Sequence, residues 1–203
     1  NSRRLVFNHK GVQALEGLLT ARFNMIKSVY THHTSKISKK MLQRSLENYL
    51  EQGNNVEKMM KMDDYRAHNQ LLNSEDPAKN IYTRIKDREL YKRALVWDID
   101  DLDKQEIRYL EKIDERNLEE KIAEEAGLKK EKVITDKPST PEIQEIDIRI
   151  KKNGEIRNMK HHSPIPEALT EAEWRLVNMA VFTPQKHREK VHQAAKKVLR
   201  DQL

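Results

Sequence analysis

The segment from Ala14 to Lys40 constrains the fold most strongly, because its apolar residues recur at the spacing of an α-helix. At about 100° per residue, five apolar side chains fall within about 60° of Arg22 and form one stripe: Leu15, Leu18, Leu19, Ile26 and Val29. We expect a helix from about residue 12 to residue 50, with a break near Thr34 and a stop at Gly53. The N-terminal part of the chain is therefore predicted to be mostly helical.

Arg22 is the unusual member of this stripe, because a guanidinium keeps its charge and its burial without a partner costs several kcal/mol. An anion is therefore expected to meet it. Spacing alone favours a carboxylate of the same fold over a bound ligand. Tyr30 lies about 80° around from Arg22, at the edge of the stripe, where its ring can pack while its hydroxyl stays free.

The motif RFNMIKSVYTHHT, preceded by LEGLLTA, resembles the long helix of the HD-superfamily nucleotide phosphohydrolases. Within that family, it is similar to the dGTPase-like enzymes and to the SAM-and-HD-domain dNTP triphosphohydrolase. The resemblance implies that Arg22 contacts the substrate triphosphate, that Tyr30 packs at the deoxyribose, and that His32 lies beside them. The sequence departs from the family pattern at Ile26, where a His or Tyr is frequent, and at His33, where Lys is common.

Two further segments extend the resemblance, which covers residues 3–100 and, more loosely, residues 130–190. The segment DRELYKRALVW resembles the part of the family that closes the helical domain and leads into a strand. There Arg88 and Lys92 are expected to be structural, and no chemistry is assigned to them. The segment SPIPEALTEAEWRLVNMAVFTP resembles the C-terminal module of bacterial and archaeal HD phosphohydrolases.

The remaining pattern predicts an α+β fold. Residues 1–116 are expected to continue an HD-type helical domain, and residues 117–203 to form a small α+β module with a three- or four-stranded sheet. One helix is predicted over residues 104–126, so it begins in the first part and ends in the second. In the second, Ile146, Ile148 and Ile150 alternate before an Asn153-Gly154 turn, which predicts a hairpin.

Three smaller expectations concern local structure. The cluster of Met59, Met60 and Met62 is expected to fill gaps in the core. Thr170 and Glu173 are interpreted as a capping box that opens a helix. The acidic run DIDDLD at residues 98–103 lacks the glycine and distal glutamate of a calcium loop, so we interpret it as the cap of the next helix.

The sequence lacks the metal ligands of an HD enzyme. In that family the metal is held by one His, a His-Asp dyad and a later Asp, but no His is followed by Asp in this sequence. The adjacent pairs His32-His33 and His161-His162 point to different sides of any regular element. Cysteine, a Gly-x-Ser-x-Gly motif and a glycine-rich phosphate loop are also absent from the sequence. We therefore expect no catalytic or metal-binding residue in this chain, which alone should be inactive, and a divalent metal in a separate HD core.

Charge and composition point to partners. Residues 1–50 carry nine Lys and Arg against two acids, which suits an anionic ligand such as a nucleotide. Only 36% of residues are hydrophobic, so partner surfaces are expected to supplement a thin core. The family is typically dimeric or tetrameric and binds effector nucleotides between subunits. We therefore take His33, Lys36 and Lys40 as candidate effector or interface residues.

The leading hypothesis is the C-terminal part of a metal-dependent HD phosphohydrolase that hydrolyses deoxynucleoside triphosphates. The alternative is a non-catalytic regulatory or oligomerisation module that binds a nucleotide effector. Nucleic-acid binding ranks last, because aromatic residues make up only 5% of the chain. The start at Asn1, the absence of cysteine and the lack of a signal peptide or membrane span lead us to expect a fragment of a cytoplasmic protein.

Overall fold

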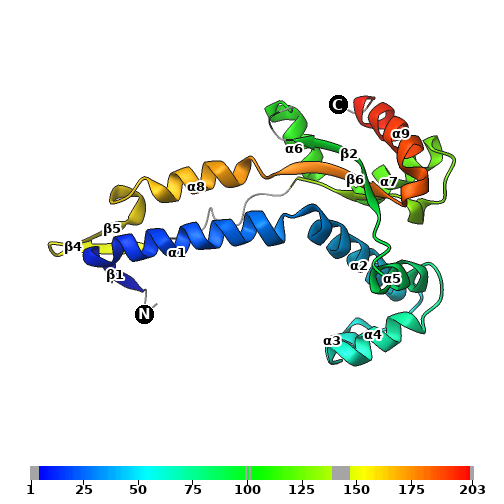
Figure 1. Cartoon of the computed structure of the whole chain (residues 1–203), viewed down its shortest axis with the longest axis horizontal. Coiled ribbons are helices and arrows are strands. Elements are labelled where there is room, and N and C mark those ends of the chain that lie inside the picture. Colours follow the sequence, from blue (N-terminus) through cyan, green and yellow to red (C-terminus); the bar gives the residue numbers. More distant parts are fainter. Residues whose placement is uncertain (1–4, 99, 101, 139–146, 202–203) are drawn as a thin grey trace.

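The computed structural model describes residues 5–98, 100, 102–138 and 147–201. It has an elongated arm and a broader lobe (Figure 1). Each part contains one three-stranded sheet. Both sheets combine strands that are distant in the sequence. The predicted α+β class is therefore confirmed.

The lobe is built on an antiparallel sheet with the strand order β2-β6-β3. Its strands are β2 (Lys92–Asp98), β6 (Asn178–Thr183) and β3 (Ile134–Asp136). The central strand β6 is apolar on both sides, because Met179 and Val181 enter one core while Ala180 and Phe182 enter another. Helices therefore cover both faces of this sheet, as a continuous apolar strand requires.

One face of the lobe sheet packs against α2 (His33–Glu51) and α5 (Ala78–Lys86). The opposite face packs against α6 (Lys104–Lys112), α7 (Glu115–Glu125) and α9 (Arg188–Arg200). Two short helices, α3 (Val56–Met60) and α4 (Asp64–Leu72), extend the layer of α2 and α5 away from the sheet (Figure 1).

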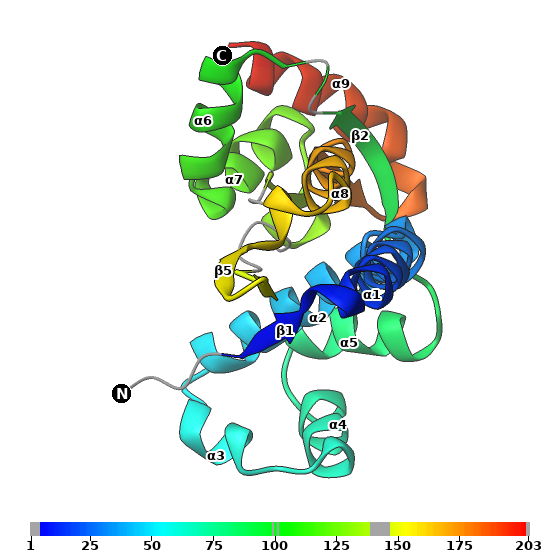
Figure 2. The same cartoon turned by 90° about the vertical axis from the view of Figure 1, so that its left-hand side faces the viewer.

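The arm consists of α1 (Val12–Met25), α8 (Ile165–Trp174) and a second sheet with the order β1-β4-β5. Figure 2 looks along this arm from its free end. The strands are β1 (Val6–Asn8), β4 (Arg149–Lys152) and β5 (Glu155–Asn158). The arm has a core of its own, formed by Val12, Leu15, Leu19, Ile150 and Met159.

The predicted long helix is divided. After α1 a wide π-helical turn, η2 (Ile26–Tyr30), is closed by the Thr31 amide, which donates to the Ile26 carbonyl at 2.9 Å. Helix α2 then begins at His33, so the expected break is confirmed, about two residues earlier than predicted. The wide turn rotates each residue by less than an α-helix does, and the side-chain directions calculated beyond Ile26 are therefore wrong.

Other local expectations divide between confirmation and correction. The hairpin is confirmed: Asn153 and Gly154 both have positive φ, as a type I′ turn needs. The helix predicted over 104–126 is wrong as a single element, because Asp114 caps a new helix by accepting from the Arg116 amide at 3.0 Å. Ile146 lies outside the described residues.

Three further corrections concern residues whose surroundings were misjudged. Thr170 lies inside α8, where its hydroxyl donates to the Pro166 carbonyl, so the predicted capping box is wrong. Of the Met cluster, Met59 packs against a core cluster as expected, but Met60 is 81% exposed and fills no core. Strand β1 was not predicted, because its partner β4 lies about 140 residues later in the sequence.

The acidic run at 98–103 lies partly outside the described residues, but its last residue confirms the expected role. Asp103 forms a capping box with Glu106 at the start of α6. Strands from both sides of residue 116 pair with one another, β1 with β4 and β2 with β6. The boundary near residue 116 stays a prediction.

Candidate functional site

The predicted substrate residues lie on α1, on η2 and at the start of α2, and all three are exposed: Arg22, Tyr30 and His32. The expected stripe is split, because Leu15 and Leu19 are buried in the arm core while Arg22 is exposed. Arg22 has exposed apolar neighbours instead: Leu18 at 64%, Met25 at 52%, Val29 at 50% and Tyr30 at 63%. The expectation that Arg22 is buried in the stripe is therefore wrong for this chain, since only one side of α1 has packing partners.

No ion pair joins Arg22 to a carboxylate within the part of the chain that the structure describes. Arg22 is therefore not neutralised by a carboxylate of the described chain, which was the first alternative. Arg22 lines none of the three cavities described below. A substrate contact at Arg22 needs another part of the protein to close the site.

His32 lies at the junction between η2 and α2. Its Nδ1 accepts a hydrogen bond from the Thr34 amide at 3.3 Å and so caps α2. Its ring lies 4.3 Å from the ring of His33, measured between centroids. The junction thus connects the helix of Arg22 and Tyr30 to the first turn of α2.

Lys36 and Lys40 face the lobe sheet and have carboxylate partners in this chain. Lys36 Nζ lies 2.8 Å from Asp136 Oδ2 and donates to Asn178 Oδ1 at 2.9 Å. Lys40 Nζ lies 2.8 Å from Glu115 Oε1. An effector at these lysines would have to compete with the carboxylates, so the geometry assigns both lysines to holding α2 against β3 and α7.

One turn further along α2, Arg44 forms a buried ion pair. Its Nη2 lies 2.6 Å from Glu119 Oε2, and the side chains are 8% and 2% exposed. The other carboxylate oxygen of Glu119 accepts from the Thr135 amide at 2.7 Å and from its hydroxyl at 3.1 Å. Burial raises the pKa of the Glu119 carboxyl, and Arg44 and Thr135 oppose this rise. The pair is structural, because its polar atoms are already engaged.

A different cluster of cations lines a cavity of about 570 Å³ between the start of α2, the start of β2 and the start of α9. We call it the basic pocket; its basic lining residues are His33, Arg88, Lys92, Arg93 and Arg188. No carboxylate occurs among the described residues that line it. Its floor is apolar and is formed by Ile37, Ile85, Leu90 and Tyr91, while Thr34, Ser38 and Gln185 add polar groups.

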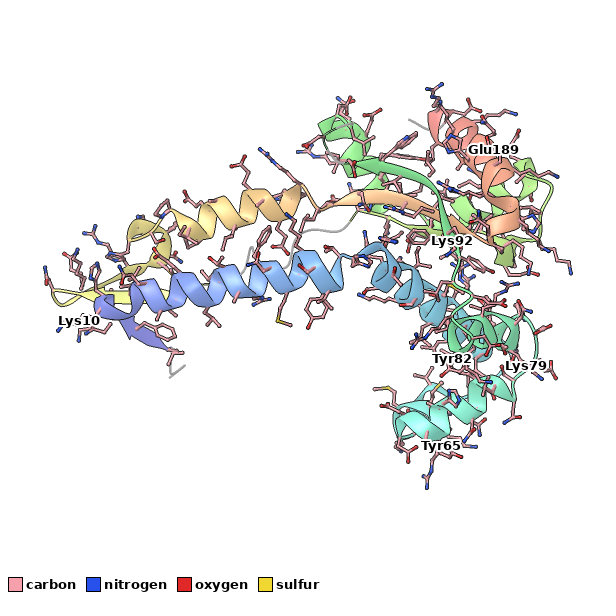
Figure 3. All side chains as sticks on the ribbon, viewed as in Figure 1. Lys10, Tyr65, Lys79, Tyr82, Lys92 and Glu189 are labelled. Carbon is pink, nitrogen blue, oxygen red and sulfur yellow. The ribbon has the colours of Figure 1, made fainter. Side chains whose placement is uncertain are left out.

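The backbone brings these cations together from distant segments. Lys92 and Arg93 are the first two residues of β2, and Figure 3 labels Lys92. Arg188 reaches across from α9, and its Nε donates to the Arg93 carbonyl at 2.9 Å. Arg88 stands in the loop after α5 with a φ of 59°, a conformation uncommon for a residue other than glycine.

The electrostatics of the basic pocket are visible at His33. Burial lowers the pKa of its imidazole below the usual 6.5, and the positive charges of Arg93, His32 and Lys92 lower it further. Protonating His33 would add a positive charge beside the arginines and the lysine of the basic pocket. A bound anion would reverse this effect, because it would favour the protonated imidazole.

Sequence reasoning included His33 among the candidates but missed the rest of the basic pocket. Arg88 and Lys92 had been given structural roles, and Arg93 and Arg188 had no role. The available signal was the density of positive charge at Arg88, Lys92 and Arg93. Nothing in the sequence showed that Arg188, 95 residues after Arg93, would join them.

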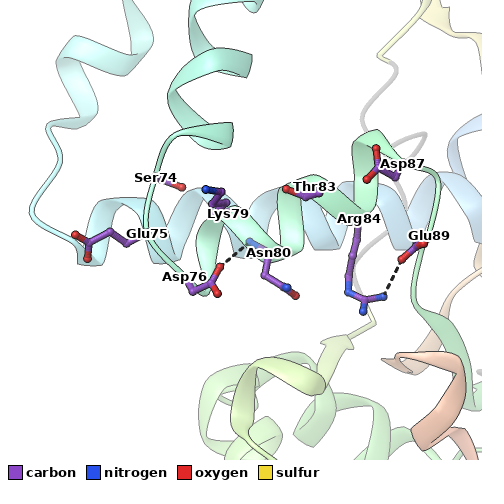
Figure 4. Close-up of a pocket in the computed structure, with 9 residues that line it drawn as sticks. All are labelled: Ser74, Glu75, Asp76, Lys79, Asn80, Thr83, Arg84, Asp87 and Glu89. Carbon is purple, nitrogen blue, oxygen red and sulfur yellow. Dashed lines mark hydrogen bonds and ion pairs between the residues drawn. The ribbon is translucent and has the colours of Figure 1, made fainter.

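A larger cavity, of about 630 Å³, lies along α5 and is shown in Figure 4. Its charges are mixed: Arg84 lies 3.7 Å from Glu89, and Asp76 Oδ1 accepts from the Asn80 amide. A third cavity of about 260 Å³ is lined by Lys40, Arg44 and Arg116, which have carboxylate partners. Volume therefore does not identify the site, and the basic pocket is the candidate because no carboxylate among the described residues lines it.

The described residues include no group of three or more His, Asp or Glu side chains arranged to hold a metal ion. The residues present do not fit the metal of an HD enzyme, so no reaction step is assigned to this part of the protein. Among the same residues, no helix is both long and apolar enough to cross a bilayer.

The chain resembles known proteins along its whole length. A family model described as "HD associated region" matches residues 1–201. An uncharacterized protein of Methanocaldococcus jannaschii is 28% identical over 198 residues, which make up 96% of this chain and 42% of that protein.

Two crystal structures share the fold. A hypothetical protein from Aquifex aeolicus superposes with a TM-score of 0.66 at 18% identity, over 96% of this chain and 48% of that chain. A phosphohydrolase from Bacteroides thetaiotaomicron superposes with a TM-score of 0.56 at 21% identity, over 91% of this chain and 53% of that chain. The chain thus spans about half the length of these relatives. Because the family model covers nearly every residue, the chain belongs to the family of HD-associated regions.

Proposed function

We propose that this region gives an HD phosphohydrolase a regulatory site for the phosphate groups of a nucleotide, and that the basic pocket is that site. One observation carries the proposal. Five basic side chains from three separate parts of the chain line one cavity, and its described lining holds no carboxylate.

Physical chemistry supports a phosphate ligand. Clustered like charges repel one another, so a group of this kind is favoured when an anion compensates it. Three of the five side chains are arginines, whose planar guanidinium groups match phosphate oxygens in pairs. The apolar floor around Tyr91 offers a surface for a sugar or base, and Ser38 and Gln185 offer hydrogen bonds.

The proposal includes a homo-oligomer, dimer or tetramer, because the resemblance implies effector binding between subunits. The openness of the basic pocket to solvent agrees with that arrangement, since its cations are exposed in one chain. A second subunit would supply the contacts that enclose the ligand.

The test uses the complete enzyme and the Arg188→Ala variant. We expect the variant to need about tenfold more nucleotide effector for half-maximal activation, because one charge-assisted contact contributes at least about 1.5 kcal/mol. The rate at saturating effector should stay unchanged. An activation curve identical to wild type would refute the regulatory role of the basic pocket.

We propose a second role on the face of α1 and η2: contacts to a deoxynucleoside triphosphate substrate by Arg22, Tyr30 and His32. The observation that favours it is a charged side chain without a carboxylate partner in the described chain, set among exposed apolar neighbours. In this proposal a separate HD core covers that face and supplies the metal ligands.

Replacing Arg22 with alanine in the complete enzyme is expected to lower kcat/KM for deoxynucleoside triphosphates by about 10- to 100-fold, the value of one charge-assisted contact. Lys27→Ala is the matched control, because Lys27 is an exposed cation in η2, five residues after Arg22 in the chain. Equal kcat/KM for wild type and the Arg22 variant would remove the assigned contact.

A further inference from the structure

The free end of the arm is strongly basic. Residues 5–11 and 147–164 contain six Lys and Arg against two carboxylates. Both carboxylates are already paired, Asp147 with Arg149 at 3.0 Å and Glu155 with Arg157 at 2.8 Å. No carboxylate within the described chain pairs with the four lysines that remain: Lys10, Lys151, Lys152 and Lys160.

Two short 3-10 turns, each capped by an asparagine, carry two of these lysines. Asn8 caps the turn η1 (His9–Gly11) by accepting from the Lys10 amide, and Asn158 caps η6 (Met159–His161) by accepting from the Lys160 amide, both at 3.0 Å. Each turn therefore ends a strand of the arm sheet and exposes a lysine beside a histidine.

The two turns meet through their histidines. The ring centroids of His9 and His162 lie 5.4 Å apart in an edge-to-face arrangement. Burial lowers the pKa of His162, and His9, Lys152, His161 and Arg157 lower it further. Its Nε2 is buried without a hydrogen-bond partner among the described groups. Positive charge thus dominates this cluster.

The shape of the arm end distinguishes between anionic ligands. The β4–β5 hairpin projects at the far end of the arm, and Lys10 lies at the same end (Figures 1 and 3). Charges spread over a projecting end fit a polymer of phosphates better than one mononucleotide, and a two-stranded ribbon fits the major groove of a duplex.

A membrane surface fits less well. The exposed apolar side chains at this end include Leu5 and Ile156, at 73% and 51% exposure. Leu5 precedes β1 and Ile156 belongs to β5, which are opposite edge strands of the arm sheet, so they form no shared apolar face for insertion.

We propose that the end of the arm, formed by the β4–β5 hairpin and the turns η1 and η6, binds the phosphate backbone of duplex nucleic acid. The site is separate from the basic pocket, so it does not depend on the regulatory role proposed there. The contacts are to phosphates, so binding should be independent of base sequence.

The experiment measures fluorescence anisotropy of a labelled DNA duplex with the complete protein at several salt concentrations. Wild type is expected to bind with a steep salt dependence, and the variant K151A/K152A/K160A to flatten the slope of log K against log salt by about 2–3. Binding should also strengthen as the pH falls below 6.5, because protonation of His162, whose pKa is lowered, adds charge beside Lys152 and Arg157.

The matched control is K121A/K190A/K196A, which removes three exposed lysines from the lobe and changes the net charge equally. It should keep the wild-type slope. Equal losses in the two triple variants would overturn the proposal, as would absence of duplex binding by wild type at low salt. Binding to phosphatidylserine vesicles that K151A/K152A/K160A abolishes, with duplex binding unaffected, would overturn it in favour of a membrane surface.

Discussion

Replacing Arg44 with methionine is expected to lower the free energy of unfolding by about 3–5 kcal/mol, because it leaves the buried Glu119 carboxylate without its counter-charge. For a chain of this size the melting temperature should fall by about 6–20 °C. Thermal and urea unfolding followed by circular dichroism measure both quantities. The effect is large because α2 is held to α7 through this pair.

The pH dependence of that loss has a definite sign. Burial already raises the pKa of Glu119 above its ordinary 4.5, and removing Arg44 raises it further. A carboxyl whose pKa is raised by folding favours the folded state below its unfolded pKa, and this advantage is lost as the pH rises through the folded value. The gap between wild type and the Arg44 variant should therefore be smaller at pH 4 than at pH 8.

Two controls separate the buried charge from general damage. Arg44→Met combined with Glu119→Gln should recover much of the loss, because the amide oxygen can still accept from Thr135 and no charge stays buried. Arg116→Ala removes a partly exposed arginine that pairs with Glu47 and should cost less than about 1 kcal/mol. Equal small losses for the Arg44 and Arg116 variants would show that the buried pair contributes little.

The largest effect on binding is expected for the basic pocket. Replacing Arg88 and Arg93 together with alanine should raise the Kd for a deoxynucleoside triphosphate about 100-fold or more, since each charge-assisted contact is worth at least about 1.5 kcal/mol. Isothermal titration calorimetry with the nucleotide and with inorganic tripolyphosphate measures the loss. Both ligands should be affected, because the lost contacts are to phosphates.

Lys58→Ala with Lys61→Ala is the matched control, because it removes two exposed cations at α3, outside the lining of the basic pocket. It should change the Kd only slightly, through the general electrostatic field. A Kd that changes equally in the two double variants would mean that net charge, and not the basic pocket, governs binding. Unfolding curves of both variants exclude a loss of structure as the cause.

Much of the fold could be predicted because its signals are local. Helical spacing over α1 and α2, the Asn153-Gly154 turn and the apolar run of β6 each depend on a few neighbouring residues. The pairing of β1 with β4 could not be found this way, because register across 140 residues depends on tertiary packing. The break between α6 and α7 was missed because apolar residues continue at near-helical spacing on both sides of Asp114.

The candidate site was less predictable for a related reason. Arg22 was expected to be buried because every apolar neighbour within reach was assigned to one buried stripe, whereas α1 packs on one side only and η2 alters the rotation after Ile26. The basic pocket depends on Arg188 approaching Arg93, a contact between residues distant in the sequence. A resemblance to a family can indicate the class of protein, but it does not show which distant residues come into contact.

The most direct test of the regulatory site is the titration of the His33 imidazole, followed by NMR with and without saturating tripolyphosphate. Arg93, His32 and Lys92 contribute to the lowered pKa of His33, and an anion in the basic pocket compensates their charge. We predict that the ligand raises the pKa of His33 in wild type but much less in the Arg88→Ala, Arg93→Ala double variant. An unchanged His33 titration at saturating ligand would contradict binding in the basic pocket.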